Sequence, residues 1–480
     1  MSDQTASTPP SAAPARIWRA GTLVYTSAGL AALFFWLLLG DFAWSMRDRS
    51  VAPMAQWYLN HLGVSSLLFG LLISSLPAAL GLVLGPVISV KSDRHRGPRG
   101  RRVPFLLVTT PIAALGMVGL GLTPLLARGV HALLPGAGEA VVALVCFGVF
   151  WTAWEFGTIA SKSVFNGLVN DVVPKPLLGR FYGLFRAIGL LDGMVFNFWI
   201  MGLVPAHFTL ILCAVGVFYG VTFMVVCLKV REGGYPPPPP EPEPDTGGGA
   251  GTGGDAGGGG GGGAAGWARR GAAETRRYCR ECFSRSYYVA VFALLMLAGV
   301  QSVPVNVFTI PYARSLGVDM GLYGKYVALS FLISLCLSFF LGWLADRFHP
   351  LRMAIVTLAG YAAVAAWGGL CATTQGAFLA AWVLHSVLGG AYLTSAASLG
   401  QRLFPHARFA QFASAGEAFV AVANMVLAPA VGMMIDASGK DYRLTFFAGG
   451  LLSLGALSCA FYVHSRFKKL GGPANYAAPE

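Results

Sequence analysis

Long apolar blocks separated by short polar loops make up most of the chain. A Pro- and Gly-rich stretch from Gly233 to Gly266 divides these blocks into two sets of six. A helix needs about 20 apolar residues to cross a hydrocarbon core of about 30 Å, and lipid admits only helices or closed barrels. The pattern therefore predicts an all-α membrane protein with twelve transmembrane helices. The expected ranges are 22–50, 64–90, 104–127, 139–168, 179–204, 207–229, 286–312, 322–345, 352–373, 376–400, 408–435 and 444–464.

Composition points the same way, because 55% of the residues are hydrophobic, only 11% are charged and the mean hydropathy is +0.62. Soluble proteins carry about twice that charged fraction. The first apolar block is too long for a signal-peptide core, so we expect it to stay as the first helix. Most cysteines lie inside apolar blocks, and the pair Cys279 and Cys282 has no second ligand pair. We therefore expect neither disulfides nor a metal site.

The net charge of +13 is concentrated in a few loops. Basic clusters lie at 91–102, in the central loop at 269–285 and at 466–469, whereas the loops on the other side of the predicted helices hold few lysines and arginines. The positive-inside rule then places both termini in the cytoplasm, in an inner or plasma membrane. We expect no nucleic-acid partner; the expected partners are a small-molecule solute and the lipid bilayer, and the expected state is a monomer. The predicted regions are an N-terminal tail (1–21), a six-helix bundle (22–230), a linker (231–285), a second six-helix bundle (286–465) and a C-terminal tail (466–480).

The two halves repeat each other in their loops. The segment 89–94 matches 342–347, each ending in Asp-Arg, and the segment 170–174 with Arg180 and Phe181 behind it matches 401–405 with Arg408 and Phe409. These residues resemble the major facilitator superfamily, whose loop signature reads Gly-x-x-x-Asp-Arg. The second copy fits well and the first has Ser89 in place of the glycine. The segments 92–105 and 170–180 resemble more specifically the sucrose-transporter-like and glycoside/pentoside/hexuronide branch.

The resemblance implies two six-helix bundles around a central cavity that opens to one side and then to the other. A carboxylate at a helix end can bind the positive N-terminus of a neighbouring helix or an arginine, which makes such a loop a candidate latch. By resemblance, Asp93 and its equivalents lock the cytoplasmic side. The alternative is that these charges only fix the topology. The candidate gating residues are Asp93, Arg94, Arg101, Arg102, Asp171, Arg180, Asp346, Arg347, Arg402 and Arg408.

Charged residues inside the predicted helices are the main candidates for a solute or proton site, because each costs at least about 2.5–3.5 kcal/mol at the bilayer centre. Glu155 and Lys162 lie seven residues apart on one helix face, about 10 Å along the axis. They form either a site or separate structural ion pairs. Asp41 and Asp48 are also seven apart; they lie either in one long helix or, if that helix ends early, partly in an external loop. The full candidate set is Asp41, Trp44, Asp48, Glu155, Thr158, Lys162, Arg186, Asp192, Asn197, Gln301, Asn306, His385, Tyr392, Glu417 and Asn424.

The second predicted helix contains no carboxylate, unlike the melibiose-type members of the resembled branch, whose cation-binding acids lie there. We therefore expect a proton rather than sodium as the coupling ion, and no other cofactor. The predicted function is secondary active transport of a sugar or glycoside by alternating access. The alternatives are an exporter of amphipathic or drug-like solutes and a transporter-like sensor. No HExxH, GxSxG or P-loop signature supports an enzyme.

Overall fold

The computed structural model describes residues 17–136, 138–235, 282–405 and 408–479. The N-terminal half begins with a two-stranded hairpin and continues as helices. Its elements are β1 (Trp18–Ala20), β2 (Leu23–Tyr25), α1 (Ser27–His61), α2 (Ser66–Gly70), η1 (Leu71–Ser75), α3 (Leu76–Arg94), α4 (Val103–Leu133), α5 (Glu139–Val172), η2 (Lys175–Leu177), α6 (Leu178–Val195), η3 (Phe196–Ile200), η4 (Met201–Leu203) and α7 (Val204–Lys229).

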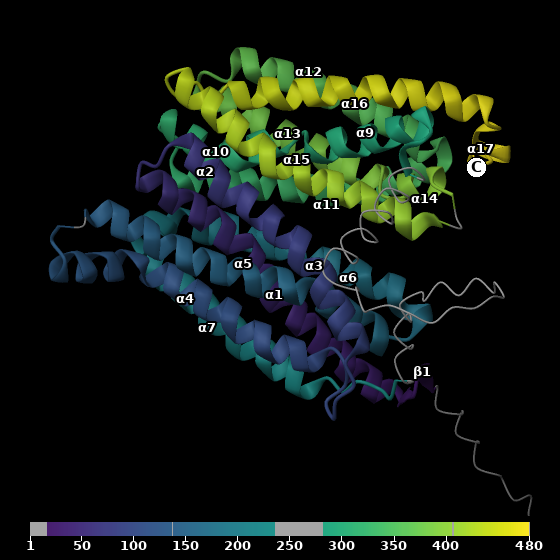
Figure 1. Cartoon of the computed structure of the whole chain (residues 1–480), viewed down its shortest axis with the longest axis horizontal. Helices are drawn as coiled ribbons and strands as arrows, with labels where there is room; N and C mark the ends of the chain where they lie inside the picture. Colours follow the sequence, from purple (N-terminus) through teal and green to yellow (C-terminus); the bar gives the residue numbers. More distant parts are fainter. Residues whose placement is uncertain (1–16, 137, 236–281, 406–407, 480) are drawn as a thin grey trace, which may run out of the picture.

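Helices are the only regular elements among the described residues of the C-terminal half. Its elements are α9 (Ser286–Val300), α10 (Val303–Ser315), α11 (Met320–Phe348), α12 (Pro350–Cys371), α13 (Gln375–Ser395), α14 (Leu399–Leu403), α15 (Phe409–Ala437), α16 (Leu444–Lys469) and α17 (Gly472–Asn475). Figure 1 shows the two halves as separate bundles lying side by side, the first in purple to teal and the second in green to yellow.

The predicted membrane-spanning helices are confirmed. Within the described ranges, eleven helical stretches are long and apolar enough to cross a membrane, and one of them, Lys175–Lys229, runs for 55 residues. That stretch is more than twice the length of one crossing and bends at His207, whose φ of −126° and ψ of 28° are not helical. It therefore supplies both the fifth and the sixth predicted helices.

The first helix is where the prediction of boundaries was least accurate. We expected it at 22–50, whereas residues 18–25 form the hairpin and α1 runs from Ser27 to His61. Thr26 caps the start of α1 by accepting a hydrogen bond from the Gly29 amide, 3.2 Å away. Asp41 and Asp48 consequently both lie inside one long helix, which decides between the two alternatives left open by the sequence.

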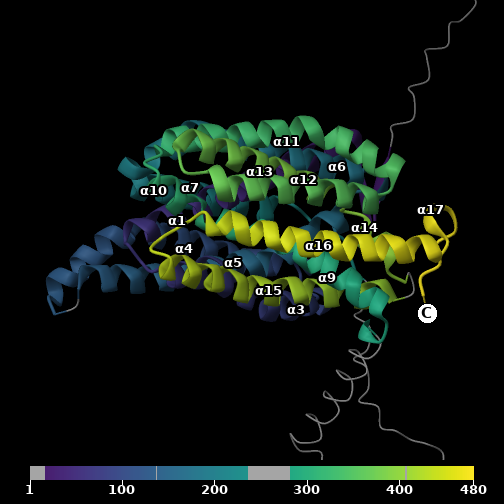
Figure 2. The same ribbon diagram turned by 90° about the horizontal axis from the view of Figure 1, so that it is seen from above.

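The halves meet along two seams. In Figure 2, α15 lies beside α3 on one side of the molecule, and α11 lies beside α6 on the other. Each seam contains a π-helical turn of the N-terminal half, η1 against α15 and η3 against α11. A π-helical turn leaves a backbone carbonyl without its regular helical hydrogen bond. In η1, the Leu72 carbonyl oxygen accepts a hydrogen bond from Trp151 Nε1 at 2.8 Å instead.

The two ends of these seams differ. We call the end that holds the loop 95–102 and the last residues of α7 and α16 the basic face, and the end that holds the loops 62–65 and 438–443 the closed face. Near the closed face a Cβ at Gly70 would lie only 2.7 Å from the Ala428 oxygen of the other half. Toward the basic face, a Cβ at Gly81, Gly85 or Gly342 would meet no atom within 4 Å. Figure 1 shows the two bundles meeting at the closed face and diverging toward the basic face.

Candidate functional site

A buried arginine organises the charged centre of the N-terminal half. Arg47 of α1 is fully buried, and its Nη2 and Nε donate to Asp48 Oδ1 at 2.8 and 3.1 Å. Its Nη1 donates to the Tyr219 hydroxyl of α7 at 3.0 Å, and its guanidinium lies 3.9 Å from the centre of the Trp44 ring. Trp44 Nε1 also donates to Asp48 Oδ2 at 3.1 Å. The Asp48 carboxylate is therefore held on both oxygens by α1 itself.

Three more acidic side chains are buried around this centre. The exposed fractions of Asp41, Glu155 and Asp192 are 7%, 7% and 1%. Asp41 lies close enough to Asp192 for their charges to interact, and Glu155 lies similarly close to Asp48 and Arg47. Oδ2 of Asp41 and Oδ2 of Asp192 have no hydrogen-bond partner among the described residues. The sequence predicted these acids, and the structure brings them from α1, α5 and α6 to one region.

The basic candidates lie at the edge of this region. Lys162 is exposed, and within the described part of the chain no ion pair joins it to Glu155. Arg186 is also exposed and donates from Nη2 to the Thr394 hydroxyl of the other half at 3.0 Å. Arg49 of α1 donates from Nε to the Gly189 oxygen of α6 at 3.2 Å, and its guanidinium lies 5.0 Å from the Phe331 ring centre of α11. These contacts bring the acidic region up to the boundary between the halves.

The C-terminal half presents a chain of neutral polar groups. The Tyr361 hydroxyl lies 2.8 Å from His385 Nδ1 and donates to the Gln301 backbone oxygen at 3.1 Å. His385 Nε2 lies 3.1 Å from Asn306 Oδ1, and the Trp382 ring stacks on the imidazole with centroids 5.3 Å apart. Gln301 Oε1 is buried without a partner among the described residues. The predicted residues Gln301, Asn306 and His385 are therefore brought together, and Tyr361 joins them.

Several other candidates are not part of either group. Asn197 lies where η3 packs against α11, and its side chain donates to Gly193 of its own helix at 2.8 Å. Tyr392 is buried in the aromatic core between α9, α14 and α15. Glu417 is exposed on α15. Thr158 Oγ1 and Asn424 Oδ1 are buried and have no partner among the described residues.

The predicted gating carboxylates pair inside their own half. Asp93 forms an ion pair with Arg102, and Arg102 Nη1 also donates to Ser92 Oγ at 2.7 Å. Asp171 pairs with Arg101 at 2.6 Å, and Asp346 pairs with Arg402 at 3.5 Å. Arg94, Arg180, Arg347 and Arg408 are exposed on the same basic face. Each loop is therefore held against its own bundle while the basic ends of the halves are apart.

The first residues of the linker bind these loops of the N-terminal half. Glu232 accepts hydrogen bonds from the amides of Arg101, Arg102 and Val103 at 3.0, 2.8 and 2.6 Å, where Val103 is the first residue of α4 and Arg102 its N-cap. The Tyr235 hydroxyl donates to Glu232 at 2.8 Å and also lies 3.2 Å from Asp171 Oδ2. Burial, followed by the nearby Glu232 carboxylate, raises the pKa of the Tyr235 phenol, which stays a donor.

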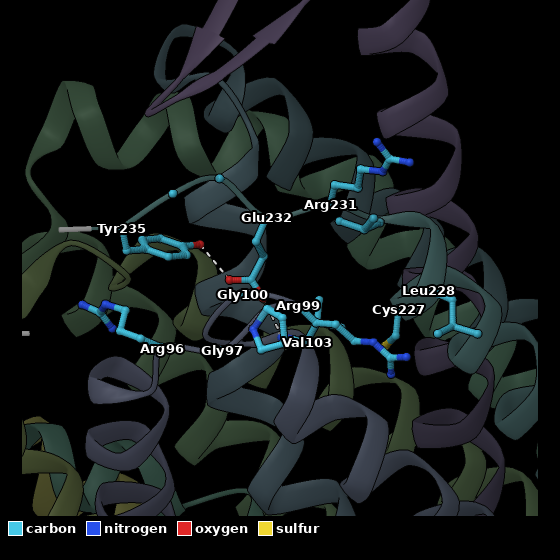
Figure 3. Close-up of a pocket in the computed structure, with 14 residues that line it drawn as sticks. Arg96, Gly97, Arg99, Gly100, Val103, Cys227, Leu228, Arg231, Glu232 and Tyr235 are labelled. Carbon is cyan, nitrogen blue, oxygen red and sulfur yellow. Dashed lines mark hydrogen bonds between the residues drawn. The ribbon is translucent and has the colours of Figure 1, made fainter. Parts of the chain in front are cut away.

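Figure 3 shows this segment as one wall of a pocket on the basic face, with the Tyr235 ring and the Glu232 carboxylate pointing toward each other. The pocket has a volume of about 790 Å³ and is lined mainly by the loop 96–103, the end of α7 and residues 230–235. The side chains of Arg96, Arg99 and Arg231 point in different directions, so they do not converge on one ligand position. The hydrogen bonds of Glu232 indicate that this region ties the linker to the loop.

The C-terminal tail makes a matching contact on the second half. The Tyr476 hydroxyl donates to the Leu403 oxygen at 2.8 Å and lies 3.1 Å from the Tyr287 hydroxyl. Its ring packs on Phe467 with centroids 4.9 Å apart. Tyr235 follows the sixth predicted helix and contacts the end of the fourth; Tyr476 follows the twelfth and contacts the end of the tenth. The duplication seen in the loops thus extends to these two tyrosines.

Comparisons with known proteins agree with this arrangement. The family model described as "MFS/sugar transport protein" matches residues 24–250, and the model "Major Facilitator Superfamily" matches residues 289–475. The two matches together take in both bundles. The chain belongs to the major facilitator superfamily. No curated protein matches it in sequence.

Solved structures of this superfamily share the fold. A bacterial homologue of the human lysosomal transporter Spinster is 15% identical with a TM-score of 0.63, over 94% of this chain and 99% of the other. A D-xylose-proton symporter is 13% identical with a TM-score of 0.63, over 90% and 97%. A point mutant of the nucleoside transporter NupG is 11% identical with a TM-score of 0.60, over 91% and 100%. This superfamily member is a transporter, as predicted, and not an enzyme.

The sequence reasoning missed several residues that organise the superfamily fold here. The sequence pattern did not predict a role for Arg47, Tyr219, Tyr361 or Asp436. Asp436 carried a usable signal, because an aspartate in the last turn of a helix faces the negative end of that helix and needs a partner elsewhere.

Across the described residues, no cluster of His, Cys, Asp and Glu could hold a metal ion. Cys279 lies outside the described residues.

Proposed function

We propose that this superfamily member moves a sugar or glycoside by alternating access, with a proton as the coupling ion. The observation that supports this most is the group of buried carboxylates, Asp41, Glu155 and Asp192, two of which have oxygens without partners among the described residues, beside the boundary between the halves. Ionised carboxylates are costly inside a bilayer and are found there mainly on ion or proton pathways. The match of the first half to a sugar transport model, and the fold shared with a xylose-proton symporter, add support.

In this proposal, the acid that has an arginine partner and the acids that have none play different roles in proton transfer. Asp48 already has Arg47 as its cation, so it is best suited to remain ionised and to bind a solute or water through its side chain, 44% of which is exposed. Glu155, Asp41 and Asp192 would take up a proton when the region is closed off, and would release it when water or a cation reaches them. Arg49 lies close enough to Asp48 and Asp192 for their charges to interact, so it is the candidate cation for this step.

Solute recognition would use the neutral chain of the C-terminal half. Tyr361, His385 and the side chains of Gln301 and Asn306 offer donors and acceptors without charge, which suits hydroxyl groups. A sugar bound between the halves would reach the neutral chain at Asn306, its exposed member, and the charged centre at Asp48.

The positive-inside rule would place the basic face in the cytoplasm of an inner or plasma membrane. The described arrangement, tight at the closed face and apart toward the basic face, would then be an inward-facing state of a monomer. In the other state, Asp93, Asp346 and their arginines would exchange partners across the closing basic face.

Uptake of labelled sugars into proteoliposomes, with and without an inward pH gradient, tests the proposal. We expect gradient-driven accumulation of at least one mono- or disaccharide, and proton movement in step with it. Exchange of a sugar without any effect of the gradient would refute the coupling. Efflux of amphipathic cations with no sugar transport would refute the substrate class.

A further inference from the structure

The closed face contains a contact between the halves that the sequence did not predict. Asp436, in the last turn of α15, accepts hydrogen bonds from the backbone amides of Ser66 and Leu67 in the N-terminal half, 3.0 Å to each. Lys440 Nζ lies 2.7 Å from Asp436 Oδ1 and donates to Ser66 Oγ at 3.1 Å. One carboxylate thus joins the end of one half to the start of a helix in the other.

We propose that Asp436, supported by Lys440, is the latch that holds the closed face shut, and that it must leave the helix start at Ser66 when this face opens. The helix that begins there is continuous through α2, η1 and α3 to Arg94. Its first amides have no partner within the helix and carry the positive end of the helix dipole. Ser65 caps only the Leu68 amide, at 3.3 Å, so Asp436 is the acceptor for Ser66 and Leu67.

The position of Asp436 makes this contact depend on the conformation of the whole molecule. Within α15 the carboxylate lies at the negative end of the helix, where a negative charge is unfavourable. Lys440 offsets that effect from the same half, but the amide donors come only from the other half. When the halves separate at this face, both the carboxylate and the amides lose their partners. The contact therefore stabilises one of the two arrangements of the bundles and not the other.

The packing beside the latch explains why the contact can form. A Cβ at Gly432 would overlap the Ser66 backbone oxygen, and one at Gly70 would lie 2.7 Å from the Ala428 oxygen. Farther along the same seam, the hydroxyls of Ser74 and Ser75 donate to the oxygens of Asn424 and Met425 at 3.0 and 2.5 Å. Glycines at the closest points let the two helices approach until the carboxylate reaches the amides.

Hydrogen exchange of the full-length protein in lipid nanodiscs tests the latch without knowledge of the solute. In Asp436→Asn, we expect the amides of residues 66–70 to exchange at least about tenfold faster, since hydrogen bonds to a charged group are lost. Lys440→Met should cause a smaller increase in the same peptide. Asp441→Asn is the matched control, because Asp441 pairs with Arg443 within its own loop, at 2.8 Å.

Unchanged exchange at residues 66–70 in both Asp436→Asn and Lys440→Met would overturn the proposal, and so would an equal increase in Asp441→Asn. Exchange within α4, far from the seam, reports whether each variant is folded. If Asp436→Asn does not fold, Lys440→Met decides the matter, because 47% of this lysine side chain is exposed. The proposal rests on the fold alone, so it stands or falls separately from the proposed sugar and proton.

Discussion

The interiors of the two halves carry different chemistry on the same helical plan. In the N-terminal half, the buried Arg47 forms an ion pair with the partly exposed Asp48, and Glu155 lies beside this pair. In the C-terminal half, the corresponding depth holds the neutral chain from Tyr361 through His385 to Asn306. At the basic face, by contrast, the halves match, with a paired carboxylate loop and a tyrosine from the following segment in each. The halves therefore share the contacts that hold each loop to its own bundle and differ in the charge of their interiors.

This comparison teaches where function can differ between the halves. A charge inside a membrane requires either a partner or access to water, so it is retained where it has a role in moving ions or solutes. A neutral chain satisfies its own hydrogen bonds and can exchange them for those of a solute at small cost. We therefore expect the N-terminal half to respond to protons and the C-terminal half to the identity of the solute.

The largest effect should come from the acids of the N-terminal half. Glu155→Gln and Asp41→Asn should reduce gradient-driven uptake to background, because each removes a titratable group from the buried region, while solute exchange at equal pH is retained. Uptake and exchange in proteoliposomes measure the two activities. Glu417→Gln, on an exposed acid of the C-terminal half, is the matched variant and should retain uptake. Retained uptake in Glu155→Gln and Asp41→Asn, together with lost uptake in Glu417→Gln, would contradict the assignment of proton coupling to the N-terminal half.

Arg47 should have the next largest effect, on stability. Arg47→Met removes the cation but keeps much of the side-chain volume, and leaves the partly exposed Asp48 and the buried Tyr219 hydroxyl without their partner. Removing one member of a buried ion pair costs about 3–5 kcal/mol, and we expect somewhat less here because Asp48 is partly exposed. Thermal unfolding in detergent should show a clear decrease in melting temperature. In Arg49→Met, which loses a hydrogen bond to the Gly189 backbone oxygen, the decrease should be smaller.

The two tyrosines at the basic face sharpen the matching part of the comparison. Tyr235→Phe and Tyr476→Phe each remove one hydroxyl and keep the ring, and should each destabilise the protein by about 0.5–1.5 kcal/mol. Their effects should add, because the two sites lie in different halves. Unfolding of the single and double variants measures this. Strong coupling between the two would show that the basic ends of the halves are in contact in the unperturbed protein.

The smallest effect concerns pH and the C-terminal half. His349 lies between α11 and α12 with φ of 75°, and its Nδ1 accepts from the Leu351 amide at 3.2 Å. Burial, aided by Arg402 and Arg352, lowers the pKa of His349 to about 4. The unfolded chain binds this proton more readily, so stability should decrease as pH falls from about 6.5 toward 4. Asparagine tolerates the same φ and can also cap a helix, so His349→Asn should keep the fold. The loss of stability between about pH 7 and 5, measured by unfolding, should be smaller in this variant. The same slope in both proteins would contradict this.

Some features of the site could be predicted from the sequence, because they follow from local rules. The apolar blocks required helices of a given length, and the repeated Asp-Arg loops indicated duplication. The rarity of charge inside those blocks singled out Asp41, Asp48, Glu155 and Asp192, all of which the structure places in one region. The neutral candidates Gln301, Asn306 and His385 also lie together, with Gln301 and His385 buried and Asn306 exposed.

Other features depended on how distant helices pack. Arg47 became the centre of the charged group only because α7 brings Tyr219 against it, and Asp436 became a latch only because α15 meets the start of α2. The sequence by itself determined the helices, their number and the residues that are costly in lipid, since these depend on length and composition. The tertiary structure decided which of those residues meet and which face is closed, because partners hundreds of residues apart are chosen by packing and not by spacing along the chain.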